Sequence, residues 1–299
     1  MRFSLATSAI ALTIAVASCA APKETLTETT PVAAETVTET ATVTEATAFM
    51  ARAESELSDM SDEASVIFWN QATNITDETN AAAAEVGARY TKLAVSLANE
   101  SKTFNLADLP PELARKMTRL RAGITIPAPS TEGAAEELSN ITTGLEAAYG
   151  TGTFNYKGKD LTLDELSTII ETSRDPEELK AVWDGWRTVS PAMKDDYARM
   201  VEIANEGANE LGYPSLDQMW LSNYDMAPEE MEAEVDRLWT QVEPLYEELH
   251  CYARSKLNAK YGDDVQPKTG PIRADLLGNM WAQDWSGIYD VVKTDTPGP

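Results

Sequence analysis

The stretch from Gly270 to Asp290 reads GPIRADLLGNMWAQDWSGIYD. It places two tryptophans, a methionine, a tyrosine and two side-chain amides within a few turns of chain. Bulky aromatic residues crowded around one amide are typical of a binding-pocket wall, in which apolar side chains dominate and a few polar groups orient the ligand. The sequence therefore predicts a buried wall in which Gln283 is the polar group.

The overall composition limits the classes of partner. The chain has 299 residues, and 49 acidic against 24 basic side chains give a formal net charge of −25. Such a field repels phosphate backbones, so the sequence argues against a nucleic-acid partner. All 7 tryptophans lie between Trp69 and Trp285, which predicts a packed body preceded by a disordered tail.

The cysteines and the histidine restrict the chemistry further. The two cysteines, Cys19 and Cys251, indicate neither a disulfide framework nor a cysteine-based zinc site. The single histidine, His250, excludes the His-Glu-x-x-His motif within this chain, because that motif needs two histidines. A Cys–His nucleophile pair fits poorly, since neighbours on a helix point about 100° apart. We therefore interpret His250 as a structural or surface residue.

The N-terminal residues 1–19 read as an export signal. An uncharged apolar run at residues 5–17 follows Arg2 and is too short for an ordinary transmembrane helix. The run ends in VASC, which resembles a bacterial lipobox and predicts lipidation of Cys19; the alternative is an ordinary cleaved signal with an incidental cysteine. Lipidation would give the protein a membrane anchor. Because Ala20 follows, we expect an outer-membrane lipoprotein or another periplasm-facing envelope protein.

Two segments follow the signal. Residues 20–44 consist almost entirely of Ala, Thr, Val, Glu and Pro, which predicts a disordered tether. Helical periods over residues 45–299 predict an all-α body with at most one small β-hairpin, near residues 151–160. We expect the apolar run at residues 66–69 to be buried. Thr162 and Glu165 predict a capping box, and the longest helix starts at Pro228, carries an apolar stripe and is expected to kink at Pro244.

Several blocks of this body, in the same order, resemble the angiotensin-converting-enzyme-like zinc dipeptidases. Residues 270–290 resemble that family's GPI…LLGNMWAQ.WS.IYD block, and the other anchors are Thr73–Thr79, Thr172–Arg174, Trp183–Arg187 and Asn209–Tyr213. The resemblance implies a helical zinc metallopeptidase that removes dipeptides from the C-termini of oligopeptides. In that family the zinc-binding His-Glu-x-x-His helix lies in the second half of the catalytic domain.

The resemblance also implies roles for three residues. Gln283 matches a glutamine that contacts the C-terminal carboxylate of the peptide; judged from spacing alone, a buried amide satisfied by backbone groups is the alternative. Arg187 and Tyr224 match residues that line chloride sites. An arginine among tryptophans is otherwise typical of a stacked structural cation.

The zinc ligands of the family are absent from this sequence, and zinc is what activates the attacking water in such enzymes. We therefore predict that the chain alone does not hydrolyse peptides. The leading hypothesis is the N-terminal half of an exported peptidyl-dipeptidase, left by a truncated or interrupted reading frame. Two alternatives stay open: a non-catalytic envelope lipoprotein that binds peptides or a partner protein, and a site completed by a separate chain carrying the zinc half.

Overall fold

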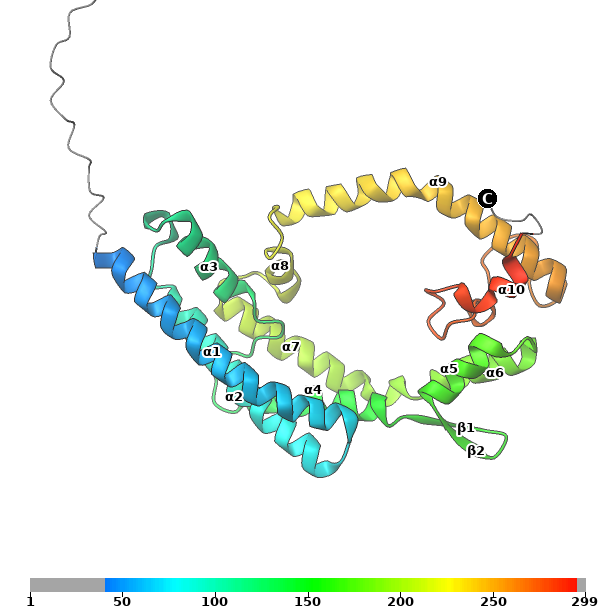
Figure 1. Cartoon of the computed structure of the whole chain (residues 1–299), viewed down its shortest axis with the longest axis horizontal. Coiled ribbons are helices and arrows are strands. Elements are labelled where there is room, and N and C mark those ends of the chain that lie inside the picture. The colour runs from blue at the N-terminus through cyan, green and yellow to red at the C-terminus, as the bar shows by residue number, and fades with distance from the viewer. Residues whose placement is uncertain (1–40, 295–299) are drawn as a thin grey trace, which may run out of the picture. The chain divides into compact units, whose positions relative to one another are not determined.

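The computed structural model describes residues 41–294, and helices dominate this part of the chain (Figure 1), which confirms the predicted all-α class. The helices are α1 (Ala41–Thr73), α2 (Asp77–Ser101), α3 (Pro111–Ala122), α4 (Ala134–Gly150), α5 (Leu163–Thr172), α6 (Pro176–Trp186), α7 (Lys194–Glu210), α8 (Leu216–Leu221), α9 (Pro228–Tyr261) and α10 (Tyr289–Val292). The strands are β1 (Thr153–Tyr156) and β2 (Lys159–Thr162). Single 3-10 turns cover Leu106–Asp108, Ser190–Met193, Ala274–Leu276 and Ser286–Ile288.

The start of the described chain differs from the predicted helix boundary. The predicted signal sequence with Cys19 lies outside the described residues, and so does the predicted tether up to residue 40. α1 begins at Ala41, four residues before the predicted start of the helical body. No proline or glycine separates this position from the amphipathic stretch that follows, so extending the helix backward costs little free energy.

α2 packs against both α1 and α4. Thr76 caps it: the Thr76 side chain accepts the N–H of Thr79, and the Thr79 hydroxyl accepts the N–H of Thr76. The two threonines thus satisfy each other's backbone donors at the start of the helix. Small side chains on the buried face of α2 let neighbouring helices approach closely, and they are Ala83, Ala84, Ala88, Ala94 and Ala98.

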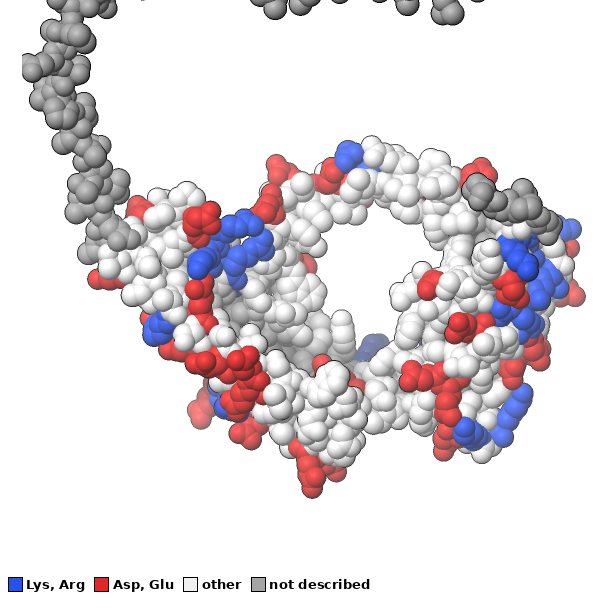
Figure 2. All heavy atoms as spheres, viewed as in Figure 1, with Lys and Arg blue, Asp and Glu red and all other residues white. Residues whose placement is uncertain are grey.

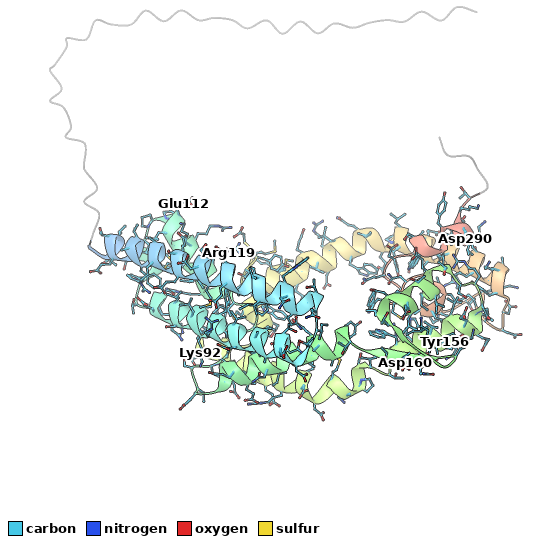
Figure 3. All side chains as sticks on the ribbon, turned by 60° about the horizontal axis from the view of Figure 1, so that its bottom comes forward. Lys92, Glu112, Arg119, Tyr156, Asp160 and Asp290 are labelled. Carbon is cyan, nitrogen blue, oxygen red and sulfur yellow. The ribbon has the colours of Figure 1, made fainter. Side chains whose placement is uncertain are left out.

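The hairpin is present where the sequence predicted it. β1 and β2 pair antiparallel with Phe154 opposite Leu161. Lys157 and Gly158 at the turn both have positive φ, 53° and 83°, as two-residue hairpin turns of type I′ require. The capping box at the start of α5 is confirmed as well (Tyr156 and Asp160 of the hairpin are labelled in Figure 3).

One hydrophobic core cluster joins the hairpin, α5, α6, the end of α9 and the 270–290 segment. Its buried members are Leu161, Leu166, Ile170, Leu179, Val182, Trp186, Leu257, Leu276, Leu277, Met280 and Ile288. The apolar residues of the 270–290 segment thus serve mainly as an anchor, whereas Gln283 and Asp284 are exposed. Packing, rather than regular secondary structure, holds this segment in place.

One expectation about burial is wrong. Val66 and Trp69 are each 72% exposed, because consecutive residues of a helix point in different directions and α1 continues through this run. The apolar stripe of α9 is also largely exposed, and Ala253 and Leu257 are the buried residues of that helix. α9 is continuous through Pro244, and its ribbon curves without a break (Figure 1).

Candidate functional site

The Gln283 loop (residues 279–286) is closed by two touching glycines. Gly278 has a φ of +76°, which favours glycine. A Cβ atom on Gly287 would lie 2.4 Å from the carbonyl oxygen of Gly278, and a Cβ on Gly278 would lie 2.8 Å from the carbonyl carbon of Gly287. The two backbones can approach this closely because neither residue has a side chain.

Hydrogen bonds inside the Gln283 loop set its shape. The Asn279 side chain accepts the N–H of Trp281 (2.9 Å), and the Asn279 carbonyl accepts the N–H of Ala282 (3.0 Å). Ala282 has a φ of +57°, a left-handed conformation that costs a non-glycine residue about 1–2 kcal/mol. Trp285 Nε1 then donates to the Ala282 carbonyl at 3.0 Å. This strained residue directly precedes Gln283 and fixes the direction in which the chain leaves the turn.

The hydrophobic core cluster and two arginines attach the Gln283 loop to the rest of the described chain. Met280 is 1% exposed and belongs to the core cluster described above. Arg187 Nη2 donates to the Met280 carbonyl at 2.6 Å. Arg174 Nη2 donates to the Gly287 carbonyl (2.6 Å) and to Asp290 Oδ1 (2.6 Å). The loop is therefore attached at both ends, while its outer residues stay free to contact a ligand.

The Gln283 loop and α9 together line a cavity of about 470 Å³. Its lining residues come from the loop and from α9, and they are Tyr246, Leu249, Ala282, Gln283, Asp284 and Trp285. The Tyr246 and Trp285 ring centroids are 6.4 Å apart, and His250 lies 6.5 Å from Trp285. A pocket that combines aromatic walls with one amide and one carboxylate suits a ligand with both apolar and polar groups.

Gln283 is exposed, so the prediction of a buried wall around it is wrong. Trp281 is 49% exposed, and the aromatic wall comes instead from Trp285 and α9. The buried glutamine is Gln266, which is 0% exposed: its Oε1 accepts the N–H of Arg273 (3.0 Å), and its Nε2 donates to the Pro271 carbonyl (3.2 Å). Backbone groups thus satisfy the Gln266 amide, whereas Gln283 is exposed and available to a ligand.

Asp284 and the α9 side of the cavity were missed from the sequence. Asp284 Oδ1 accepts the N–H of Ser286 at 2.8 Å, and this hydrogen bond lowers the pKa of Asp284 below its ordinary value. A negative charge thus stands beside the Gln283 amide. The signal for Tyr246 and Leu249 was the apolar stripe of α9, but nothing in the sequence indicated which end of the stripe meets the loop.

His250 packs beside Tyr246 and Trp285, two lining residues of the cavity, and contacts Arg254. Arg254 Nη1 contacts His250 Nδ1 at 3.2 Å and donates to the Gly270 carbonyl at 2.8 Å, while Nη2 contacts Cys251 Sγ at 3.2 Å. A guanidinium group has only donors, so His250 Nδ1 accepts in this contact and the ring proton lies on Nε2. The arrangement agrees with a structural histidine and offers no nucleophile pair.

Arg187 packs in an apolar setting. Its guanidinium carbon lies 3.3 Å from the centroid of the Trp183 ring, and Nη1 donates to the Trp183 carbonyl at 3.0 Å. Burial lowers the pKa of Arg187, while Tyr149 and Asp184 act in the opposite direction. Within the described chain, Trp183 Nε1 is the one buried side-chain polar atom without a hydrogen-bond partner. A cation bonded to neutral acceptors and an unpaired N–H donor therefore lie side by side.

Tyr224 lies elsewhere. It is 55% exposed in the turn between α8 and α9, where its N–H donates to the Leu221 carbonyl at 3.1 Å. Arg187 contacts the Gln283 loop. The contacts of the described residues join Tyr224 neither to Arg187 nor to Gln283. The resemblance implied chloride contacts for Arg187 and Tyr224, and of these two residues Arg187 contacts the Gln283 loop, through Met280.

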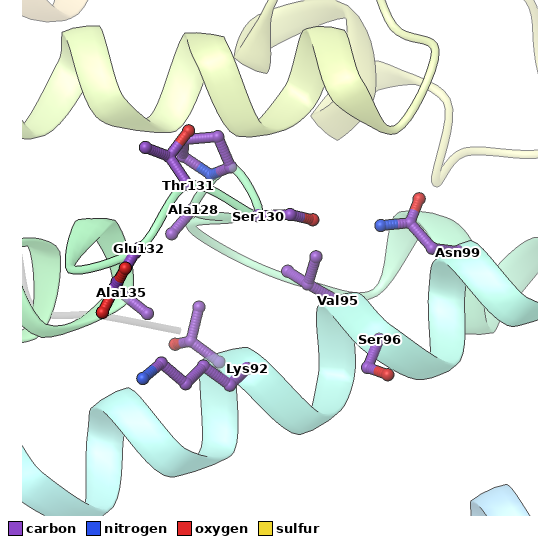
Figure 4. Close-up of a pocket in the computed structure, with 11 residues that line it drawn as sticks. Lys92, Val95, Ser96, Asn99, Ala128, Ser130, Thr131, Glu132 and Ala135 are labelled. Atoms are coloured by element: carbon purple, nitrogen blue, oxygen red, sulfur yellow. The ribbon is translucent and has the colours of Figure 1, made fainter.

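A second cavity, of about 460 Å³, lies between α2 and the loop before α4 (Figure 4). Two of its lining residues are already paired with carboxylates outside the cavity: Lys92 pairs with Glu136, and the N–H of Ser130 donates to Glu210 at 2.6 Å. None of the predicted site residues lines it. The cavity at the Gln283 loop is therefore the better candidate site.

Comparison with known proteins shows the family of this chain. Residues 40–297 match the family described as Angiotensin-converting enzyme. The chain belongs to the angiotensin-converting enzyme family. It is 31% identical to an angiotensin-converting enzyme of Haematobia irritans exigua over 83% of this chain and 41% of that protein. It is 35% identical to an angiotensin-converting enzyme of Theromyzon tessulatum over 74% and 36%, and 32% identical to the angiotensin-converting enzyme-like protein Ace3 of Mus musculus over 75% and 30%.

The chain thus spans about two fifths or less of the length of these angiotensin-converting enzyme relatives. Within residues 41–294, no group of three or more His, Cys, Asp or Glu side chains could hold a metal ion. The residues present therefore do not fit the zinc site that the family implies. No helix of the described chain is both long and apolar enough to cross a membrane.

Proposed function

We propose that this chain forms the carboxylate-binding wall of a peptidyl-dipeptidase, in which the Gln283 amide donates to the C-terminal carboxylate of an oligopeptide. The observation that carries the proposal is the glycine-closed loop, which presents exposed Gln283 at a cavity walled by Tyr246 and Trp285. Family membership supports the substrate class. The acidic neighbour Asp284 opposes a bare carboxylate, so the amide and the aromatic walls must supply the affinity.

Peptide binding tests the role of Gln283 directly. An oligopeptide with a free C-terminus should bind the full chain about tenfold more tightly than its C-terminal amide, because one hydrogen bond to a charged group contributes about 1.5–3 kcal/mol. Gln283→Leu should remove this preference, whereas the control Gln241→Leu, at an exposed position of α9, should keep it. Isothermal titration calorimetry gives the measurement. Equal affinities for both peptides in the unchanged protein would refute the proposed role.

We further propose that the chain alone does not cleave peptides. Hydrolysis in this family implies zinc, and a chain with one histidine lacks the two that the zinc motif needs. The purified full chain, incubated with zinc and an oligopeptide, should release no dipeptide detectable by mass spectrometry. Chelator-sensitive release would overturn the proposal. Release that appears only after a second, histidine-containing polypeptide is added would show that a separate chain completes the site.

Arg187 and Tyr224 are proposed as chloride contacts. Support for Arg187 comes from its neutral acceptors and from the unpaired Trp183 N–H beside it. At constant ionic strength, replacing gluconate by chloride should raise the melting temperature, because an anion that binds only the folded state stabilises it. Arg187→Leu should abolish this rise and Tyr224→Phe should reduce it, while the control Arg237→Leu should leave it intact. Identical chloride responses in all four proteins would exclude the site.

Export to the cell envelope and lipidation of Cys19 are proposed from the sequence alone. The pertinent residues lie outside the described chain, so the N-terminus itself must be measured. In a bacterial host the protein should fractionate with membranes and carry acyl groups on Cys19, and Cys19→Ala should release it. A non-catalytic peptide-binding lipoprotein, the alternative function, predicts the peptide binding described above without cleavage in the presence of any partner chain.

A further inference from the structure

Arg174, in the turn between α5 and α6, uses every donor of its guanidinium group. Nη1 donates to the carbonyl oxygens of Glu171 (2.8 Å) and Ser173 (2.7 Å), at the end of α5. Nη2 donates to the Gly287 carbonyl (2.6 Å) and to Asp290 Oδ1 (2.6 Å), and Nε donates to Asp290 Oδ2 at 3.3 Å (Asp290 is labelled in Figure 3). A guanidinium group has five N–H donors, so all of them are engaged.

A helix cap is the simpler interpretation of this arginine. The last carbonyl groups of a helix lack partners within the helix, and a basic side chain can satisfy them. The carbonyls of Glu171 and Ser173 take only the two Nη1 donors. The other donors go to Gly287 and Asp290, which lie 113 and 116 residues further along the chain. A cap needs neither of these contacts, so Arg174 also holds the segment that follows the Gln283 loop.

The contact with the Gly287 carbonyl bears on where the Gln283 loop ends. Gly287 has no side chain to anchor it, and its backbone lies directly against that of Gly278 at the start of the loop. A shift of the Gly287 carbonyl would therefore move the closing contact and, with it, the turn that carries Gln283. Near the other end of the loop, Met280 is fixed by its buried side chain as well as by Arg187. The end at Gly287 thus depends more on hydrogen bonding than the end at Met280 does.

The planar fork of Arg174 gives this attachment its geometry. Both carboxylate oxygens of Asp290 accept from the guanidinium, and such a bidentate pair holds a planar group in one orientation. The Arg174 side chain is 23% exposed. More exposed ion pairs are common in the described chain, and Figure 2 shows basic groups in small patches beside acidic ones. A lysine would keep the charge at this position but could not reproduce the fork.

We propose that Arg174 is a positioning residue for the Gln283 amide. Through Gly287 it sets the place of the loop, and thereby the preference of the site for a free peptide carboxylate. This role rests on the proposed carboxylate contact of Gln283. Because a small misplacement of a binding group is costly, disturbing Arg174 should reduce selectivity for the carboxylate more than it reduces peptide binding as a whole.

Selectivity is measured on the full chain by isothermal titration calorimetry, with an oligopeptide that has a free C-terminus and with its C-terminal amide. Arg174→Lys should reduce the preference for the free C-terminus from about tenfold to less than about threefold. Asp290→Asn keeps the guanidinium, removes the charge of its partner and should reduce the preference to about fivefold. The matched control Arg199→Lys should keep the preference, because Arg199 forms a comparable bidentate pair with Glu137 outside the core cluster of the loop.

Hydrogen exchange, followed by mass spectrometry without peptide, gives a second readout. In Arg174→Lys, exchange should rise in residues 279–290 and stay close to the parent in α2. An unchanged tenfold preference would overturn the proposal. So would an equal loss of affinity for both peptides with faster exchange throughout the core cluster, since that is the result of a purely structural role.

Two further readings keep the experiment decisive. If Arg174→Lys does not fold, Asp290→Asn is judged by the same criteria, and an unchanged preference in that variant overturns the proposal. Equal affinity of the parent for both peptides would instead refute the carboxylate contact of Gln283 itself. The exchange of residues 279–290 would then still show whether Arg174 positions the loop, so the two failures are distinct.

Discussion

α2 consists largely of alanine and polar residues, whereas α9 carries leucine, valine, tryptophan and tyrosine at regular steps, yet α2 is the buried helix. α2 has 25 residues with 10 buried, and α9 has 34 residues with 2 buried. Small side chains allowed α1 and α4 to cover α2 closely. The pattern of α9 shows that one face needs a cover, but it does not show that this chain supplies the cover.

The comparison is tested most strongly by two leucines of the same helix. Leu257→Ala should lower the free energy of unfolding by about 2–5 kcal/mol, because Leu257 is 0% exposed in the core that also holds the Gln283 segment. Leu245→Ala, at a position 71% exposed, should change it by less than about 0.5 kcal/mol. Urea unfolding at neutral pH measures both. Equal losses would mean that Leu245 is covered in solution.

Two glycines extend the comparison to the Gln283 loop. Gly287→Ala should cost about 1–3 kcal/mol, because its Cβ would lie 2.4 Å from a backbone oxygen and the loop would have to open. Gly144→Ala, in α4, meets no atom within 4 Å and should instead stabilise the protein by up to about 1 kcal/mol. Thermal and urea unfolding of both variants give the sign. A neutral Gly287→Ala would contradict the closed loop.

A smaller, pH-dependent effect on the free energy of unfolding distinguishes Glu178 in α6 from Glu247 in α9. The Lys157 ammonium donates to Glu178 Oε1 at 2.9 Å and Ser173 Oγ donates to Oε2 at 2.8 Å; these contacts lower the pKa of Glu178, while its partial burial opposes them. A lowered folded-state pKa stabilises the protein above the ordinary glutamate pKa, and this contribution is lost as the pH falls through the folded value.

Glu178→Gln should therefore cost about 1 kcal/mol at pH 7, and the difference from the parent should vanish in acid. Glu247→Gln, on the exposed part of α9, should have little effect at pH 7. Urea unfolding at several pH values from neutral to about 3.5 provides the measurement. A difference for Glu178→Gln that grows on acidification would mean that the carboxylate does not stabilise the folded state.

Local features could be predicted from the sequence because their causes lie within a few residues. The Thr162–Glu165 capping box, the hairpin at Lys157–Gly158 and the helix that starts at Pro228 each depend on neighbouring side chains and on allowed backbone angles. The block that contains Gln283 does line a cavity, but as an exposed loop and not as the buried wall that was expected.

Burial could not be predicted in the same way, because it depends on which distant segment packs against each residue. Gln266 and Gln283 have similar chemistry, but only Gln266 is surrounded by carbonyl groups of its own turn. Val66 to Trp69 were expected inside because they are apolar, although a helix cannot turn four successive residues to one side. The α9 wall of the cavity was missed because its contact with the Gln283 loop joins residues far apart in sequence.

The contact between Gly278 and Gly287 makes the segment between them a replaceable cassette. Its two ends meet backbone to backbone, and Met280, Ala282 and Trp285 pack against the core. Libraries that keep both glycines, Asn279, Met280, Ala282 and Trp285 can therefore vary Gln283 and Asp284 with little penalty to the scaffold. Ligand preference and fold stability could then be engineered separately in this molecule.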